Sequence, residues 1–243
     1  MIYTFVAGLS LIIYGSTLPD AEQTKTKHTK DRPLKILTLG DSNGALPDGW
    51  VYQLKMIMPG DSIFNISISG NTIGFNNLGR TSLNTLTNIG TYMKKAHNQL
   101  GKINAIIIML GTNDCKAAFK DSISFVPGNM RKLIIEIKNA ARQKREKPLI
   151  FIVTPPPFGA DDMLEEKYKG GLERIAWLNR ELIKIADEEN IYSINTYNIL
   201  LPVFRNLTTE GVHLNPDGQR MIAFIIWENL KFFNGNRILK HND

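Results

Sequence analysis

The sequence predicts an α/β fold in which a parallel sheet is covered by helices on both faces. From Leu34 onward, short apolar runs alternate with longer segments of helical periodicity. The run at 106–110, Ile-Ile-Ile-Met-Leu, has no polar alternation, which is typical of a central strand buried on both sides. With 243 residues, 43% of them hydrophobic, the chain is long enough to bury one sizeable core. Cys115 is its one cysteine, so the fold depends on packing rather than on internal disulfides.

The predicted elements follow one another in regular alternation. Strands are expected at Leu34–Leu39, Ser62–Ile68, Ile103–Leu110, Leu149–Thr154 and Ile191–Asn195. Helices are expected at Trp50–Met58, Leu83–Leu100, Asn129–Lys144 and Leu164–Glu189, with a last one after Asn215. Asn215 as N-cap and Pro216 at the first helical position mark the start of that last helix. Ligands of such open sheets bind beyond the carboxyl ends of the strands, so the residues that follow each strand are the candidates for function.

Residues 1–18 are predicted to be an export signal. Phe5 to Tyr14 is almost wholly apolar, too short to span a bilayer, and followed by small residues at 15–17. No Lys or Arg precedes the run and no A-x-A site follows it, and a packed N-terminal strand or helix is the alternative. Residues 19–33 read as a polar linker and 34–243 as the functional domain. We therefore expect an exported protein, periplasmic or secreted, without stable membrane anchoring.

The formal charge of +6 does not by itself indicate a nucleic-acid partner. The basic residues are spread along the chain, and their densest cluster, between Lys138 and Lys147, fits the solvated end of a helix. A nucleic-acid interface would need a basic face with interleaved aromatic or polar readers, and no such module is present in the sequence. We expect no nucleic-acid partner.

A serine follows the first predicted strand, in the glycine-rich turn 40–44 (Gly-Asp-Ser-Asn-Gly). Such a turn would expose the hydroxyl of Ser42 at the edge of the sheet. The motif is ambiguous, because an ordinary turn and the nucleophile elbow of the α/β-hydrolases fit it as well. Alone it does not establish a catalytic serine.

Two further strand ends carry candidate donors for an oxyanion. Gly70 follows the second strand, where its N–H could approach a substrate closely, although a glycine required only by a tight turn is the better explanation of this position taken alone. Asn113 follows the third strand and offers a neutral amide, and a turn in which it caps its own backbone is the alternative.

A histidine precedes the last predicted helix. His213 follows Glu210 by three positions, so the carboxylate could hold the imidazole while the other ring nitrogen takes a proton from serine. His28, His97 and His241 have no such neighbour and are expected at the surface. Each signal is weak alone, but all four residues are expected at strand ends along the same edge of the sheet. They are Ser42, Gly70, Asn113 and His213.

These residues resemble the blocks of the SGNH (GDSL) hydrolase family, with Ser42, Gly70, Asn113 and His213 in the four named positions. The resemblance extends from Leu34 to about Phe233. It implies a flavodoxin-like three-layer sandwich with a five-stranded parallel sheet in the order 2-1-3-4-5, a shallow active site, and no cofactor or metal. Three segments are similar to the arylesterase and acetylesterase branch, whose substrates are short acyl esters, often acetylated sugars: 106–116 (IIIMLGTNDCK), 154–157 and the glycines at 170–171.

The resemblance implies a carboxylic ester hydrolase with a covalent acyl-enzyme. His213 would deprotonate Ser42, and the backbone N–H groups of Ser42 and Gly70 with the amide of Asn113 would bind the oxyanion. The family usually has aspartate where this chain has Glu210. Glutamate can complete a triad, or Ser42 and His213 can work as a dyad assisted by a backbone carbonyl while Glu210 faces solvent. We expect the triad.

Other residues near these positions have simpler interpretations. Asp41 and Asp114 are expected to brace backbone N–H groups rather than to act as paired carboxylates, and Cys115 to be a small buried hydrophobe. Residues Pro155 to Phe158 are predicted to restrict the backbone and form one wall of the acyl pocket. Trp50 and Phe158 are predicted to face the substrate, and Trp177 to lie in the core.

Two other functions stay open at the level of sequence. A thioesterase or lysophospholipase of the same fold would act on long acyl chains, and a non-catalytic carbohydrate-binding protein would keep the fold without activity. The expected partner is a small-molecule or carbohydrate ester, and the sequence leaves assembly into a homo-oligomer open.

Overall fold

The computed structural model describes residues 33–239, with side chains described up to Lys231. Its centre is a five-stranded parallel sheet in the order β2-β1-β3-β4-β5, as predicted. The strands are β1 (Lys35–Gly40), β2 (Ser62–Ser67), β3 (Ala105–Met109), β4 (Leu149–Val153) and β5 (Tyr192–Ile194). Every pairing is parallel, so all five carboxyl ends lie along one edge.

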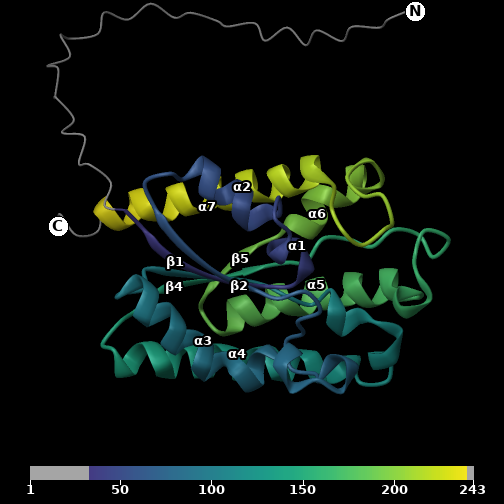
Figure 1. Cartoon of the computed structure of the whole chain (residues 1–243), viewed down its shortest axis with the longest axis horizontal. Helices are drawn as coiled ribbons and strands as arrows, with labels where there is room; N and C mark the ends of the chain where they lie inside the picture. Colours follow the sequence, from purple (N-terminus) through teal and green to yellow (C-terminus); the bar gives the residue numbers. More distant parts are fainter. Residues whose placement is uncertain (1–32, 240–243) are drawn as a thin grey trace, which may run out of the picture. The chain divides into compact units, whose positions relative to one another are not determined.

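Helices cover both faces of the sheet (Figure 1). They are α1 (Ser42–Ala45), α2 (Trp50–Ile57), α3 (Thr85–Leu100), α4 (Val126–Gln143), α5 (Gly171–Glu188), α6 (Thr196–Leu200) and α7 (Pro216–Leu239). In Figure 1 α2 and α7 lie on one side of the sheet and α3, α4 and α5 on the other. Short 3-10 turns occupy Asn77–Gly79, Thr81–Leu83, Asn113–Cys115, Ala117–Phe119, Ile123–Phe125, Glu166–Tyr168 and Leu201–Asn206.

Each face of the sheet has its own hydrophobic core, because successive strand residues point to opposite sides. On β3, Ile106 and Ile108 pack with the residues of α3, α4 and α5, whereas Ile107 and Met109 pack with those of α2 and α7. The whole of β3 is buried, which confirms its prediction as the central strand. This two-sided packing holds the carboxyl edge of the sheet in place.

The helix boundaries differ from the predicted ones where a local feature overrides periodicity. The predicted helix from Leu164 begins only at Gly171, after Gly170 in a left-handed conformation with φ 66°. Residue 171 must be small, since a Cβ there would lie 2.4 Å from the ring of Phe158. α4 starts earlier than expected, at Val126, with Pro127 in its first turn. The short helix α6 was not predicted.

The N-terminal predictions lie outside the described residues. These are the export signal at 1–18 and all but the last residue of the linker at 19–33, so export stays a prediction. Within residues 33–239 no helix has both the length and the apolarity that a membrane span requires.

Candidate active site

Ser42 is the first residue of α1, two positions after the end of β1 at the carboxyl edge of the sheet. Asp41 is the N-cap of this helix, and its Oδ1 accepts a hydrogen bond from the backbone N–H of Asn43 at 3.1 Å. Gly44 lets the turn lie close to β2, since a Cβ there would fall 2.4 Å from Ser67 Oγ. The turn therefore presents the serine side chain at the end of β1.

Three side chains form a continuous line at this edge. The Oγ of Ser42 lies 2.9 Å from Nε2 of His213, and Nδ1 of His213 lies 2.8 Å from Oε1 of Glu210. The same carboxylate oxygen accepts the backbone N–H of His213, so Glu210 contacts both the ring and the main chain of the histidine. The side chains of His213 and Glu210 are 38% and 36% exposed, so the line ends near solvent. The dyad alternative requires Glu210 to point away from His213 into solvent, whereas its carboxylate contacts the ring.

Asn43 joins the serine turn to the histidine loop, 171 positions away in sequence. Its Oδ1 accepts from the N–H of Leu214 and from Nε2 of Gln219, both at 3.0 Å. Oε1 of Gln219 in turn accepts the first N–H of α2, at Trp50, at 2.8 Å. All of these groups are buried, so the network fixes His213 relative to Ser42. Sequence reasoning missed Asn43 and Gln219, because no local pattern marks a contact of this range.

The loops after β2 and β3 are joined in the same way. Gly70 has φ 88°, in the left-handed region that favours glycine, and its carbonyl accepts from Nδ2 of Asn77 at 2.7 Å. Nδ2 of Asn113 donates to the carbonyl of Asn71 at 2.9 Å. Asn113 therefore bridges to the neighbouring loop and does not cap its own turn. Nδ2 of Asn71 reaches the carbonyl of Gly40 at 3.3 Å, which connects both loops to the end of β1.

The two buried aspartates near the site brace the backbone, as expected. Both oxygens of Asp114 lie 3.0 Å from the N–H of Ile73, and Asp41 binds the N–H of Asn43. Burial raises the pKa of Asp114 to about 7, and the charge of Asp41 adds to that rise. Burial also raises the pKa of Asp41, against the lowering effect of the Thr112 hydroxyl. Cys115 is fully buried, and its burial raises the pKa of the thiol, so it is a core residue and not an activated nucleophile.

Two predictions about aromatic residues were wrong. Trp50 is 0% exposed in the core beneath α7, and Phe158 is 3% exposed with its ring edge-on to Tyr168, so neither faces the substrate. Both were assigned from their proximity in sequence to strand ends, which does not determine the direction of a side chain. Trp177 packs against the core as expected. Residues 155–158 are buried throughout, and their predicted role as a pocket wall stays a prediction.

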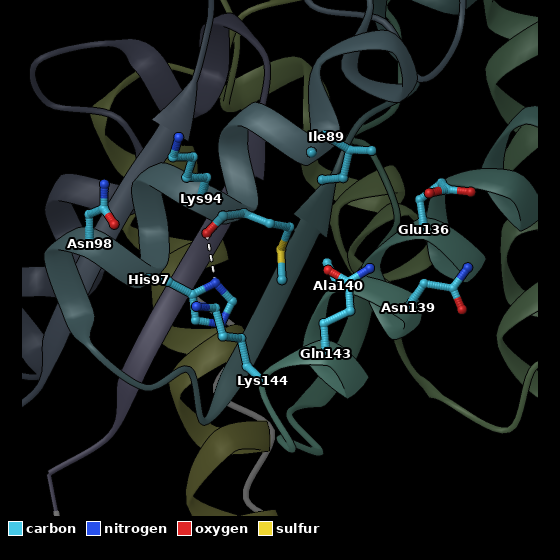
Figure 2. Close-up of a pocket in the computed structure, with 11 residues that line it drawn as sticks. Ile89, Lys94, His97, Asn98, Glu136, Asn139, Ala140, Gln143 and Lys144 are labelled. Atoms are coloured by element: carbon cyan, nitrogen blue, oxygen red, sulfur yellow. Dashed lines mark hydrogen bonds between the residues drawn. The ribbon is translucent and has the colours of Figure 1, made fainter.

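His97 was predicted at the surface, and its side chain is only 8% exposed. Nδ1 contacts the carbonyl of Met93 at 2.8 Å and Nε2 contacts Glu146 at 3.2 Å. It lines a cavity of about 450 Å³ between α3 and α4 (Figure 2). Glu146 also accepts the N–H of Ile103, just before β3, which places this cluster toward the amino-terminal edge of the sheet, opposite to Ser42.

No group of three or more His, Cys, Asp or Glu side chains among the described residues has the arrangement of a metal site. A serine linked through histidine to a carboxylate, at the carboxyl edge of a 2-1-3-4-5 sheet, defines the class of SGNH-fold serine hydrolases.

The sequence comparison then identifies the family: the chain belongs to the GDSL-like lipase/acylhydrolase family, whose family model matches residues 37–221. It is accordingly a carboxylic ester hydrolase that acts on small-molecule esters. A comparison with characterised protein sequences found no significant match.

Solved structures share the fold at low sequence identity. A carbohydrate acetylesterase from Sinorhizobium meliloti is 20% identical with a TM-score of 0.66, covering 82% of this chain and 99% of the other. An aryl esterase from M. smegmatis is 19% identical with a TM-score of 0.67, covering 82% and 98%. A lipase/acylhydrolase from Enterococcus faecalis is 15% identical with a TM-score of 0.58, covering 84% and 97%.

Proposed function

We propose that this esterase hydrolyses short-chain acyl esters, above all acetyl esters of carbohydrates or similar hydroxylated compounds, through a Ser42–His213–Glu210 triad. The observation that carries the proposal is the continuous hydrogen-bonded line from Ser42 Oγ through both ring nitrogens of His213 to Glu210. An imidazole held by a carboxylate on one nitrogen presents its other nitrogen, unprotonated, to the serine hydroxyl.

The reaction follows from this geometry in two steps. His213 Nε2 takes the proton of Ser42 as Oγ attacks the ester carbonyl, and the imidazolium is stabilised by Glu210. The tetrahedral intermediate collapses, His213 gives the proton to the departing alcohol, and the acyl group remains on Ser42. Water, deprotonated by His213, then attacks the acyl-enzyme and releases the carboxylic acid and free serine.

The proposed oxyanion site consists of the backbone N–H groups of Ser42 and Gly70 and the amide of Asn113. Asn113 supports this role because its amide has two N–H bonds, and one of them is already oriented by the carbonyl of Asn71. A donor held in place before the reaction stabilises developing charge without reorganisation, and loss of one such donor costs about 3 kcal/mol in the barrier.

The preference for short acyl groups is supported by resemblance. Structures of similar fold include a carbohydrate acetylesterase and an aryl esterase, and the segment 106–116 resembles that branch of the family. The alternative is a long-chain thioesterase or lysophospholipase of the same fold.

Kinetics on p-nitrophenyl esters test the proposal. We expect p-nitrophenyl acetate to be hydrolysed with a kcat/KM that falls from acetyl to dodecanoyl, and Ser42→Ala to abolish turnover above background. Asn198→Ala, at an exposed position, serves as a control. Rates that rise toward dodecanoyl would replace the short-chain assignment with the long-chain one. If no release above background depends on Ser42, the Ser42 esterase mechanism is refuted and a non-catalytic carbohydrate-binding protein is favoured.

A further inference from the structure

Lys116 is a buried cation directly after the turn that contains Asn113. The residue is 9% exposed. Its Nζ lies 3.4 Å from Oδ1 of Asn77, a neutral amide, and 5.5 Å from the centre of the Tyr168 ring. Among the described residues it forms no ion pair with any carboxylate.

This environment is unfavourable for an isolated ammonium group. Lysine has three N–H donors, and a buried charge without a counter-ion is costly unless a ligand completes its partners. Burial lowers the pKa of Lys116, and the positive charge of Lys167 lowers it further, against the opposing effect of Asp41 and other acidic groups. A negative group from outside the chain would offset both the cost of burying the ammonium charge and its repulsion by Lys167.

The contacts of Lys116 connect it to the loop that carries Gly70. Asn77, its acceptor, donates through Nδ2 to the carbonyl of Gly70, the proposed oxyanion donor. Tyr168, beneath its Nζ, has its pKa raised by burial and by the charges of Asp41 and Glu210, so the ring lies within the field of the catalytic groups. Lys167 lies 5.3 Å from the centre of the same ring but is paired with Glu165 at 2.7 Å, which leaves Lys116 as the cation in need of an anion.

We propose that Lys116 selects the substrate by binding an anionic group, a carboxylate, on the alcohol portion of the ester. The inference rests on the proposed function, because an acetyl group carries no charge and the negative group must then belong to the alcohol. The preferred substrates are acetylated hydroxy acids, including acidic sugars. The bound carboxylate would accept hydrogen bonds from the Lys116 N–H groups that do not face Asn77 while Ser42 attacks the acetyl carbonyl.

Two esters that differ in one charge test the proposal: 4-acetoxybenzoate and its neutral methyl ester. For each enzyme we divide kcat/KM for the anionic ester by kcat/KM for the neutral ester. The two esters differ in leaving-group reactivity, but this difference cancels when the ratio is compared between variants. We expect Lys116→Met to lower this ratio about 10- to 100-fold while the neutral ester changes by less than about 3-fold. Lys116→Arg should retain most of the ratio. Lys94→Met, which removes one positive charge from an exposed position on α3, should leave it unchanged.

Equal losses on both esters would overturn the proposal, because they would show that Lys116 only positions Asn77 and the Gly70 loop. An unchanged ratio would overturn it as well. Binding of 4-acetoxybenzoate to Ser42→Ala, measured by calorimetry with and without Lys116→Met, separates this inference from the proposed function. If the wild-type chain turns over neither ester while binding to Ser42→Ala depends on Lys116, the anion site is supported and the acetylesterase mechanism is refuted. Absence of such binding would refute the anion site whatever the activity.

Discussion

The buried carboxylate of Asp114 makes a specific prediction about how stability depends on pH. Asp114 is 0% exposed and accepts the N–H of Ile73, which follows the loop that contains Gly70 and Asn71. Burial raises its pKa from 3.8 to about 7. The perturbation is Asp114→Asn, which keeps an oxygen acceptor for Ile73 but cannot titrate.

The sign follows from proton binding. Because the folded-state pKa lies above the unfolded value, the native chain holds more protons than the unfolded chain between about pH 4 and pH 7. The contribution of this group to stability is therefore fully present below pH 4 and is lost as the pH rises to 7. Each pH unit within that window corresponds to about 1.4 kcal/mol, so between pH 5 and pH 8 the wild type loses about 2–3 kcal/mol that the variant does not lose.

The assay is urea unfolding of both proteins at pH 5, 6, 7 and 8. We expect the unfolding free energy of Asp114→Asn minus that of the wild type to rise by about 2–3 kcal/mol across this range, on top of any constant offset from the altered hydrogen bond. Asp121→Asn, at an exposed position, is the matched control and should show a smaller change. Parallel stability curves for wild type and Asp114→Asn would show that the carboxylate is ionised in the native state at pH 5, which would refute the reasoning.

Two further predictions separate the function of the site from the stability of the fold. Glu210→Gln should lower kcat about 10²- to 10³-fold, because an amide can favour the wrong tautomer of His213. The loss of stability should be small, since the side chain of Glu210 is partly exposed. Kinetics on p-nitrophenyl acetate measure the change in kcat, and a loss below about 3-fold would favour the dyad. His97→Ala should lower the unfolding free energy by about 1–3 kcal/mol, because buried Glu146 would keep only the N–H of Ile103 as a partner. The variant should keep kcat/KM, and a selective loss of activity would contradict the placement of His97 at the amino-terminal edge.

Much of the fold is readable from the sequence because strands and helices have local periodicities. The uninterrupted run at 106–110 predicts a strand buried on both faces, and β3 is buried throughout. Asn215 predicts a helix N-cap, and its Oδ1 accepts the N–H of Gly218 at 3.0 Å. The helix predicted from Leu164 was wrong at its start, because Gly170 adopts a left-handed backbone conformation that interrupts the helix and that periodicity does not report.

The sequence by itself determined the alternation of elements, the positions of Ser42, Gly70 and Asn113 after strands and that of His213 before the last helix, since each depends on residues close together in the chain. The tertiary structure alone decided that His213 reaches Ser42, that Asn43 holds the histidine loop, and that Lys116 is buried beside Asn77 and Tyr168. These contacts join segments whose separation in space is set by how helices pack on the sheet. The direction of a side chain and the solvent around it therefore follow from packing, and no local pattern encodes them.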